Sequence, residues 1–140
     1  MSNPFALTAR FMRRSHSERR LLIAQSLLFV SAHVLLRFAS LQRTRERLRG
    51  LAVCIRAKAE DPQQLTWSAD RIGAVLPGRH SCLIHALACD AAAASSGIPV
   101  EFRIGAARGA KGHRFHAWLE HRGTTIVGHG HADFVAFAQF

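Results

Sequence analysis

Two side chains in the second half of the chain have the types and the order that thiol chemistry requires. Cys82 stands at the start of a run of small and apolar residues, and His116 follows it 34 positions later. A thiol reacts as its thiolate, and an imidazole is a common base for removing the thiol proton. We therefore take Cys82 as the candidate nucleophile and His116 as the candidate general base.

A helix is predicted to begin at Cys82 and to extend to Ala94. Small and apolar residues recur there at helical spacing, and the sequence Gly-Ile-Pro at 97–99 supplies a stop signal. The N-terminus of a helix offers unpaired N–H groups and the positive end of the helix dipole. Both stabilise a thiolate, and the N–H groups can also hold the oxyanion of a tetrahedral intermediate.

Three segments after this helix alternate apolar with polar residues, which predicts antiparallel strands. They are VEFRIGA at 100–106, HRFHAWLE at 113–120 and TTIVG at 124–128, and turns containing glycine separate them. His116 falls in the second of these strands. The expected sheet therefore carries the candidate base, and the expected helix carries the candidate nucleophile.

The N-terminal half is predicted to be mainly helical. Residues 1–16 contain scattered arginines without a sustained period, so we expect a mobile arm there. An apolar helix is predicted from Ser17, a suitable N-cap, and a second helix over residues 41–59.

A third, short helix is expected between these helices and Cys82. Asp61-Pro62 predicts a turn, and the segment TWSADRIGAVL at 66–76 follows it. Thr66 or Ser68 can cap this helix, and Pro77-Gly78 ends it.

The composition favours one folded domain. The chain has 140 residues, of which 49% are hydrophobic and 20% charged, too apolar for a disordered protein. The apolar stretch at 21–36 is shorter than the roughly 20 residues of a membrane span and contains polar side chains, and no signal peptide is evident. Three cysteines without a CxxC pair argue against a disulfide framework and fit a reducing cytoplasm.

The net charge of +10 lies almost entirely in the N-terminal part. Residues 1–60 contain 12 Lys and Arg against 3 Asp and Glu, whereas residues 61–140 contain 7 against 6. Such a basic region can meet an acidic peptide or protein, anionic lipid or nucleic acid, or it can be a solvated face. Its densest cluster is Arg43, Arg45, Arg47 and Arg49.

The segment LPGRHSCLIHALACDAAAASSGIPVEFRIGAA, followed by HRFHAWLEHRGTTIVG, resembles the leader peptidases of lasso peptide biosynthesis, the transglutaminase-like B proteins of those pathways. In that family a proline and a serine lead into Cys-Leu, a helix ends at Gly-Ile-Pro, and a strand ends at Ile-Gly. His-Ala-Trp-hydrophobic-Glu then opens a hairpin. Members made as a separate peptidase subunit also carry an arginine-rich helical lead-in.

The resemblance, with the predicted elements, implies an α+β fold in a single structural domain. A basic helical N-terminal layer, residues 1–60, is expected to pack on a compact transglutaminase-like (papain-like) core, residues 61–140. This core would contain a central helix and a small antiparallel sheet.

The implied activity is that of a cysteine peptidase that removes the leader from a lasso peptide precursor before a separate cyclase closes the macrolactam. No metal or organic cofactor is needed for this reaction. The implied partners are the precursor leader peptide, a separate small leader-binding protein and the lasso cyclase, without nucleic acid. The basic N-terminal region would hold the precursor or the leader-binding protein, or touch the membrane surface peripherally.

Carried over by position, Cys82 matches the nucleophile of the family and His116 its base, but the third member departs from the pattern. Many relatives have an acidic residue about a dozen positions after the histidine, where this chain has Gly128. We rank Asp133 first as a replacement, then Glu120 and His129. A dyad with a backbone carbonyl orienting the imidazole is a further alternative.

Other residues near the pair have both a functional and a structural interpretation. Trp118 shares the strand face of His116 and can wall a substrate cleft or pack in the core. His80 and Ser81 flank the nucleophile and can contact substrate. Cys89 is expected to be a small buried core residue and Cys54 to be structural.

Two functions of other classes compete with the peptidase. A metal-binding module would use the late histidines, which are His113, His116, His121, His129 and His131. Strand alternation sends His113 and His116 to opposite faces, which disfavours that module. A nucleic-acid-binding module would use the basic N-terminal helices, but the sequence shows no recognisable motif for one.

Overall fold

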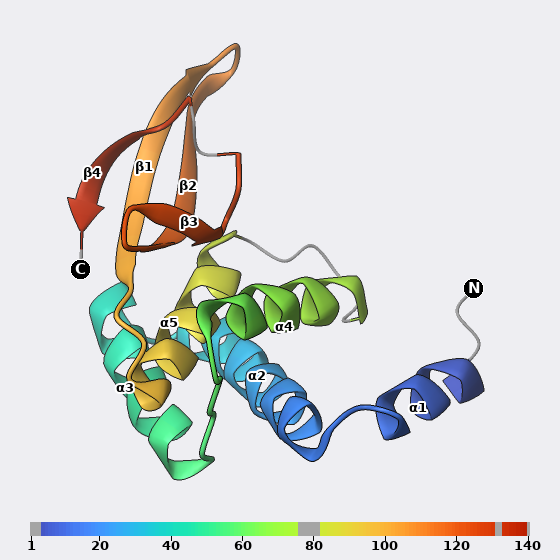
Figure 1. The fold of residues 1–140 in the computed structure, drawn as a ribbon. Helices are drawn as coiled ribbons and strands as arrows, with labels where there is room; N and C mark the ends of the chain where they lie inside the picture. Colours follow the sequence, from blue (N-terminus) through green and yellow to red (C-terminus); the bar gives the residue numbers. More distant parts are fainter. Residues whose placement is uncertain (1–3, 76–81, 131–132, 140) are drawn as a thin grey trace.

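The computed structural model describes residues 4–75, 82–130 and 133–139 of the chain, and within these ranges it is an α+β fold. The helices are α1 (Pro4–Met12), α2 (His16–Leu35), α3 (Leu41–Cys54), α4 (Pro62–Val75) and α5 (Cys82–Ser96). The strands are β1 (Glu101–Gly109), β2 (Gly112–His121), β3 (Thr124–Val127) and β4 (Val135–Gln139). Figure 1 shows the helices gathered on one side of the molecule and the sheet on the other.

The helix α5 is the centre of the fold, as the sequence predicts. It packs against α2, α3 and α4 on the helical side and against β2 on the sheet side. Five of its alanines are buried, and these small side chains let the neighbouring helices approach closely. Gly97, with a φ of 71°, ends the helix in the left-handed conformation that glycine adopts without strain.

The first two helices differ from the sequence-based expectation. Residues expected to be a mobile arm form α1. The N-cap of α2 is Ser15 rather than Ser17, because Ser15 Oγ accepts from Glu18 N while the Glu18 carboxylate accepts from Ser15 N. This reciprocal capping box satisfies two N–H groups, which explains why the helix begins two residues earlier.

The boundaries of α3 and α4 also move. The expected helix over 41–59 ends at Cys54, and Arg56 follows in a left-handed conformation with a φ of 53°. The helix α4 begins at Pro62 rather than near Thr66, because Asp61 Oδ1 caps it by accepting from Gln64 N at 2.8 Å. Proline is well suited to the first helical position. None of the helices in the described ranges is long and apolar enough to cross a membrane.

Two arginines of the cluster on α3 bind a buried carboxylate. Asp90 of α5 is fully buried, and its carboxylate accepts two hydrogen bonds each from Arg45 and Arg49, at 2.9–3.0 Å. These contacts raise the pKa of Arg49 above its ordinary value. The ion pairs fasten α3 to α5, whereas Arg43 and Arg47 are exposed.

The sheet confirms the three predicted strands and adds a fourth. Its order is β3-β2-β1-β4, and all neighbouring pairs are antiparallel. The additional strand, β4, pairs with the outer edge of β1. Thr66 Oγ1 of α4 donates to the carbonyl of Ile126 at 2.7 Å, which ties β3 to the helical layer.

Candidate active site

Cys82 is the first residue of α5, where the sequence predicts it. Its side chain is half-buried, and its Sγ accepts a hydrogen bond from the backbone N–H of Ala117 on β2 at 3.4 Å. The packing of α5 on β2 therefore places the thiol beside the residue that follows His116. The first N–H groups of α5 have no partner within the helix and carry the positive end of its dipole.

The imidazole of His116 is oriented by a backbone carbonyl. His116 Nε2 lies 2.8 Å from the carbonyl oxygen of Gly128. A carbonyl oxygen can only accept, so Nε2 carries the hydrogen and the neutral ring has its lone pair on Nδ1. This tautomer provides a base at Nδ1.

Gly128 reaches this position because it has no side chain. Its φ is 83°, and a Cβ placed on it would lie 2.6 Å from the carbonyl oxygen of Ala117 and 2.9 Å from Trp118 Cα. Contacts this short are not accommodated by rigid backbone atoms. The backbone after β3 therefore approaches β2 closely only with glycine at this position.

Two aromatic side chains, one from β2 and one from the residue before β4, contact the imidazole. The ring of Trp118 stacks on His116 with centroids 6.0 Å apart, and Phe134 contacts His116 at 5.1 Å. Trp118 is 2% exposed, and its Nε1 donates to Glu120 Oε1 at 2.8 Å. Glu120 Oε2 in turn lies 2.9 Å from Arg103 Nε. This network fixes the indole that packs against the candidate base.

Gly105 makes room for that indole. A Cβ on Gly105 would lie 2.8 Å from the Trp118 ring and 2.9 Å from the carbonyl oxygen of Val135. The Ile-Gly end of the first predicted strand is thus the sequence signal for this contact. Gly105 and Phe134 were not among the site residues predicted from the sequence.

A cavity of about 240 Å³ opens beside the thiol. Helix α4 contributes Thr66, Ala69 and Asp70, α5 contributes Cys82 and His85, and the β3 segment contributes Ile126, Val127, Gly128 and His129. The thiol and the residue that orients the imidazole therefore line one hollow, between α4 and the end of β3.

The other sequence-based candidates lie in different places. Asp133, ranked first as the third member, is exposed, while the hydrogen bond of His116 Nε2 goes to Gly128. Glu120 holds Trp118 and Arg103, and His129 lines the cavity. His80 and Ser81 lie outside the described residues.

The remaining cysteines differ sharply from Cys82. Cys89 is 1% exposed, as predicted, and burial raises the pKa of its thiol to about 12. It accepts from Gln25 Nε2 at 3.5 Å in a buried polar cluster that also contains Ser68. Cys54, at the end of α3, is exposed.

The described part of the chain contains no group of three or more His, Cys, Asp or Glu side chains that could hold a metal ion. Among the late histidines, His116 contacts Gly128, and His121 Nδ1 lies 2.7 Å from the carbonyl oxygen of Pro99. These two imidazoles therefore contact backbone carbonyls.

Comparison with protein families gives one match that spans most of the fold. A family model described as the transglutaminase-like superfamily matches residues 26–139. The matched range begins inside α2 and includes both Cys82 and His116. Comparison with curated proteins and with solved structures found no match.

Proposed function

Because the chain belongs to the transglutaminase-like superfamily, we propose that it is a cysteine peptidase that removes the leader from a lasso peptide precursor. Cys82 is the nucleophile and His116 the general base. The proposal is supported by the sequence blocks around these two residues, which resemble those of the lasso leader peptidases, and by the geometry of the site.

One observation carries the chemical part of the proposal. The thiol at the N-terminus of α5 contacts Ala117 N, and His116, the preceding residue of β2, is held by Gly128 in the tautomer that has its lone pair on Nδ1. A thiol at a helix start beside an oriented imidazole is the arrangement that activates a cysteine nucleophile. In this proposal the Gly128 carbonyl replaces the side chain of a third triad member.

The reaction proceeds in two steps. His116 Nδ1 takes the thiol proton, and the thiolate of Cys82 attacks the carbonyl carbon at the leader–core junction. Backbone N–H groups at the start of α5 stabilise the oxyanion. The C–N bond then breaks as His116 returns the proton to the departing amine of the core peptide, leaving the leader as a thioester on Cys82.

Water completes the cycle. His116 removes a proton from a water molecule that attacks the thioester, and the leader leaves with a free carboxylate while Cys82 regains its proton. The new N-terminus of the core peptide is the substrate of a separate lasso cyclase. The precursor leader and a small leader-binding protein are the other proposed partners, and the cytoplasm is the proposed compartment.

A cleavage assay tests this proposal. The purified chain is incubated with a lasso precursor peptide and its leader-binding protein, and the products are identified by mass spectrometry. We expect one cut between leader and core with the wild-type chain, and none with Cys82→Ala. Cleavage at the wild-type rate by Cys82→Ala would show that Cys82 is not the nucleophile. If Cys82 reacts with a small alkylating agent but the chain cleaves none of the lasso precursors tested, the proposed substrate is wrong.

A further inference from the structure

An apolar stripe on α2 is left uncovered by the fold. Ile23, Leu27, Val30 and Val34 are 54%, 50%, 54% and 49% exposed. Their spacings of four, three and four residues place them in one row along the helix. The opposite side of α2, which includes Leu21, Leu28 and Ala32, is buried in the core. The helix is therefore apolar on two sides, only one of which is covered by the part of the chain that the structure describes.

The N-terminal end of this stripe runs into an apolar groove. A hollow of about 360 Å³ lies between α1, α2 and α4, and Ile23 is one of its lining residues. Phe11, Leu22, Trp67, Ile72 and Val75 contribute further apolar surface. Val75 is 59% exposed. The groove and the stripe together form one apolar track, which we call the α2 track.

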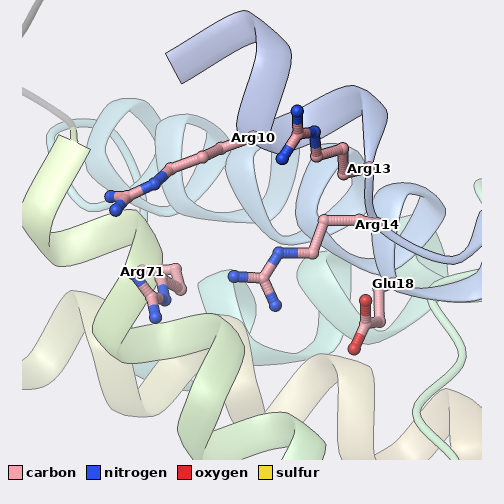
Figure 2. Close-up of a pocket in the computed structure, with 5 residues that line it drawn as sticks. All are labelled: Arg10, Arg13, Arg14, Glu18 and Arg71. Carbon is pink, nitrogen blue, oxygen red and sulfur yellow. The ribbon is translucent and has the colours of Figure 1, made fainter. Parts of the chain in front are cut away.

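Arginines crowd the same end of the track. A neighbouring hollow of about 440 Å³ is lined by Arg10, Arg13, Arg14, Glu18 and Arg71, and Figure 2 shows the arginine side chains extending into the space between α1 and α4. Arg10, Arg14 and Arg71 also line the apolar groove. Arg14 additionally lies over the Trp67 ring, with its Cζ 4.9 Å from the centroid.

We propose that the α2 track and its arginines dock an acidic amphipathic helix of a partner protein. A row of apolar side chains at helical spacing matches the apolar face of a second helix. Of the described residues lining the arginine hollow, four are cationic and one is anionic. Carboxylates at one end of the incoming helix complement that charge and bind guanidinium groups in paired hydrogen bonds.

The charge pattern disfavours a second copy of this chain as the occupant. Between residues 4 and 37 the sequence carries six arginines and one acidic residue, with Arg19 and Arg20 at one end of α2 and Arg37 beyond the other. Two α2 helices packed together in either direction would therefore bring arginines close to arginines. Shape disfavours a membrane, because a flat bilayer surface does not fill two hollows between helices.

The track lies close to the candidate thiol without overlapping it. Helix α4 lines the groove with Trp67, Arg71 and Ile72, and it lines the cavity beside Cys82 with Ala69 and Asp70. One helix, about 10 Å across, thus separates the two sites. A docked partner would raise the local concentration of any peptide it carries. The docking inference does not depend on the proposed peptidase function, since it is tested by binding alone.

A designed peptide is the probe for this site. It is a fluorescein-labelled 21-residue peptide with Leu at spacings of four, three and four, Glu in its first turn, and Ala and Gln elsewhere to favour the helix. Two controls have the same length: one scrambles the Leu positions, and the other replaces every Glu by Lys. Fluorescence anisotropy with the full chain is expected to give binding about tenfold tighter for the patterned acidic peptide than for either control.

Two variants and a matched control locate the binding. The double variant Arg13→Glu with Arg71→Glu is expected to bind the patterned acidic peptide about tenfold more weakly than the wild-type chain. The double variant Leu27→Gln with Val30→Gln is expected to weaken binding of that peptide by a similar factor. Arg43→Glu with Arg47→Glu is the control, because it makes the same charge change on α3, at the other end of the helical layer from α1 (Figure 1). Circular dichroism melting confirms that each variant is folded.

Several results would overturn the proposal. Equal binding of the patterned and scrambled peptides, or equal weakening by the α3 control, would reduce the effect to general charge attraction. If sedimentation equilibrium shows that the wild-type chain is a dimer and that the variant Leu27→Gln with Val30→Gln is a monomer, the stripe binds a second copy of the chain instead. Binding to vesicles containing phosphatidylserine without binding to the patterned peptide would assign it to a membrane.

Discussion

The tautomer of the neutral His116 ring follows from the atom that its Nε2 contacts. Gly128 offers a carbonyl oxygen, so the ring must donate there and keep its basic nitrogen on the other side. Gly128 stands in the sequence at the spacing where many relatives have the acidic third residue of the triad. Because glycine has no carboxylate, the sequence-based prediction ranked Asp133 first instead. A main-chain acceptor exists at every residue, and only the φ of 83° and the close approach to β2 distinguish this one.

Gly128→Ala tests the orienting contact. We expect it to lower kcat by up to about a hundredfold, because the clash with Ala117 displaces the carbonyl from His116. Gly123→Ala is the matched control, since Gly123 has a φ of 79° but nothing within 4 Å of an added Cβ. Both variants lose stability, about 1 kcal/mol or more, through the left-handed backbone. Equal kcat values for the two variants would contradict the orienting role.

The three thiols are expected to differ in function. Cys82→Ala should abolish cleavage with the fold intact, whereas Cys54→Ala and Cys89→Ala should retain activity, the latter with a stability loss of about 1–2 kcal/mol. Leader release measured by chromatography, together with thermal melting, separates the two effects. Loss of cleavage in folded Cys89→Ala would count against the assignment.

Cys89 also gives a pH dependence of stability. Its pKa in the folded protein is about 12, against an ordinary value of 9.0, so above pH 9 its thiol ionises in the unfolded chain first. The free energy of unfolding should therefore fall between pH 9 and 12, with this residue contributing at most about 1.4 kcal/mol per pH unit. Denaturant titrations should show a shallower decline for Cys89→Ala. Because Cys54 is exposed, the Cys54→Ala variant should show the same decline of the free energy of unfolding with pH as the wild-type chain. An identical decline in the wild-type chain, Cys54→Ala and Cys89→Ala would refute the effect.

At the level of elements, the central helix and three of the strands were predictable because local patterns define them. Alternation with glycine turns marked β1 to β3, and the Gly-Ile-Pro stop marked the end of α5. Helix α1 was missed because its run is short and its residues show no sustained helical period. Strand β4 was missed because its ladder to β1 is a contact between distant segments, which no local pattern reports.

The arginine cluster on α3 shows the same limit. Sequence spacing revealed four charges, but Asp90, which pairs with Arg45 and Arg49 only, lies more than 40 residues away. Arg45→Gln with Arg49→Gln should lower the free energy of unfolding by about 3 kcal/mol or more, because it leaves a buried carboxylate without its counter-ions. Arg43→Gln with Arg47→Gln removes the same charge from exposed positions and should change it by less than about 0.5 kcal/mol. Equal destabilisation in urea titrations would contradict this division of the cluster.

For the whole molecule, the helical layer and the sheet have separate tasks. The sheet supplies His116 and its orienting contacts, and the helical layer supplies Cys82 and the basic surface. Packing of α5 on β2 brings the two halves of the candidate site together. The basic residues of the N-terminal part include the two arginines paired with Asp90, the exposed Arg43 and Arg47 on α3, and the arginines beside the α2 track.

The thioester intermediate tests the central claim most directly. A precursor and leader-binding protein are mixed with the enzyme, quenched in acid within the first turnover, and analysed by intact and tandem mass spectrometry. We expect a leader acyl group on Cys82, absent from Cys82→Ala and from alkylated enzyme, and unaffected by a metal chelator. Cleavage without any adduct on Cys82, abolished by the chelator and resistant to alkylation, would contradict it.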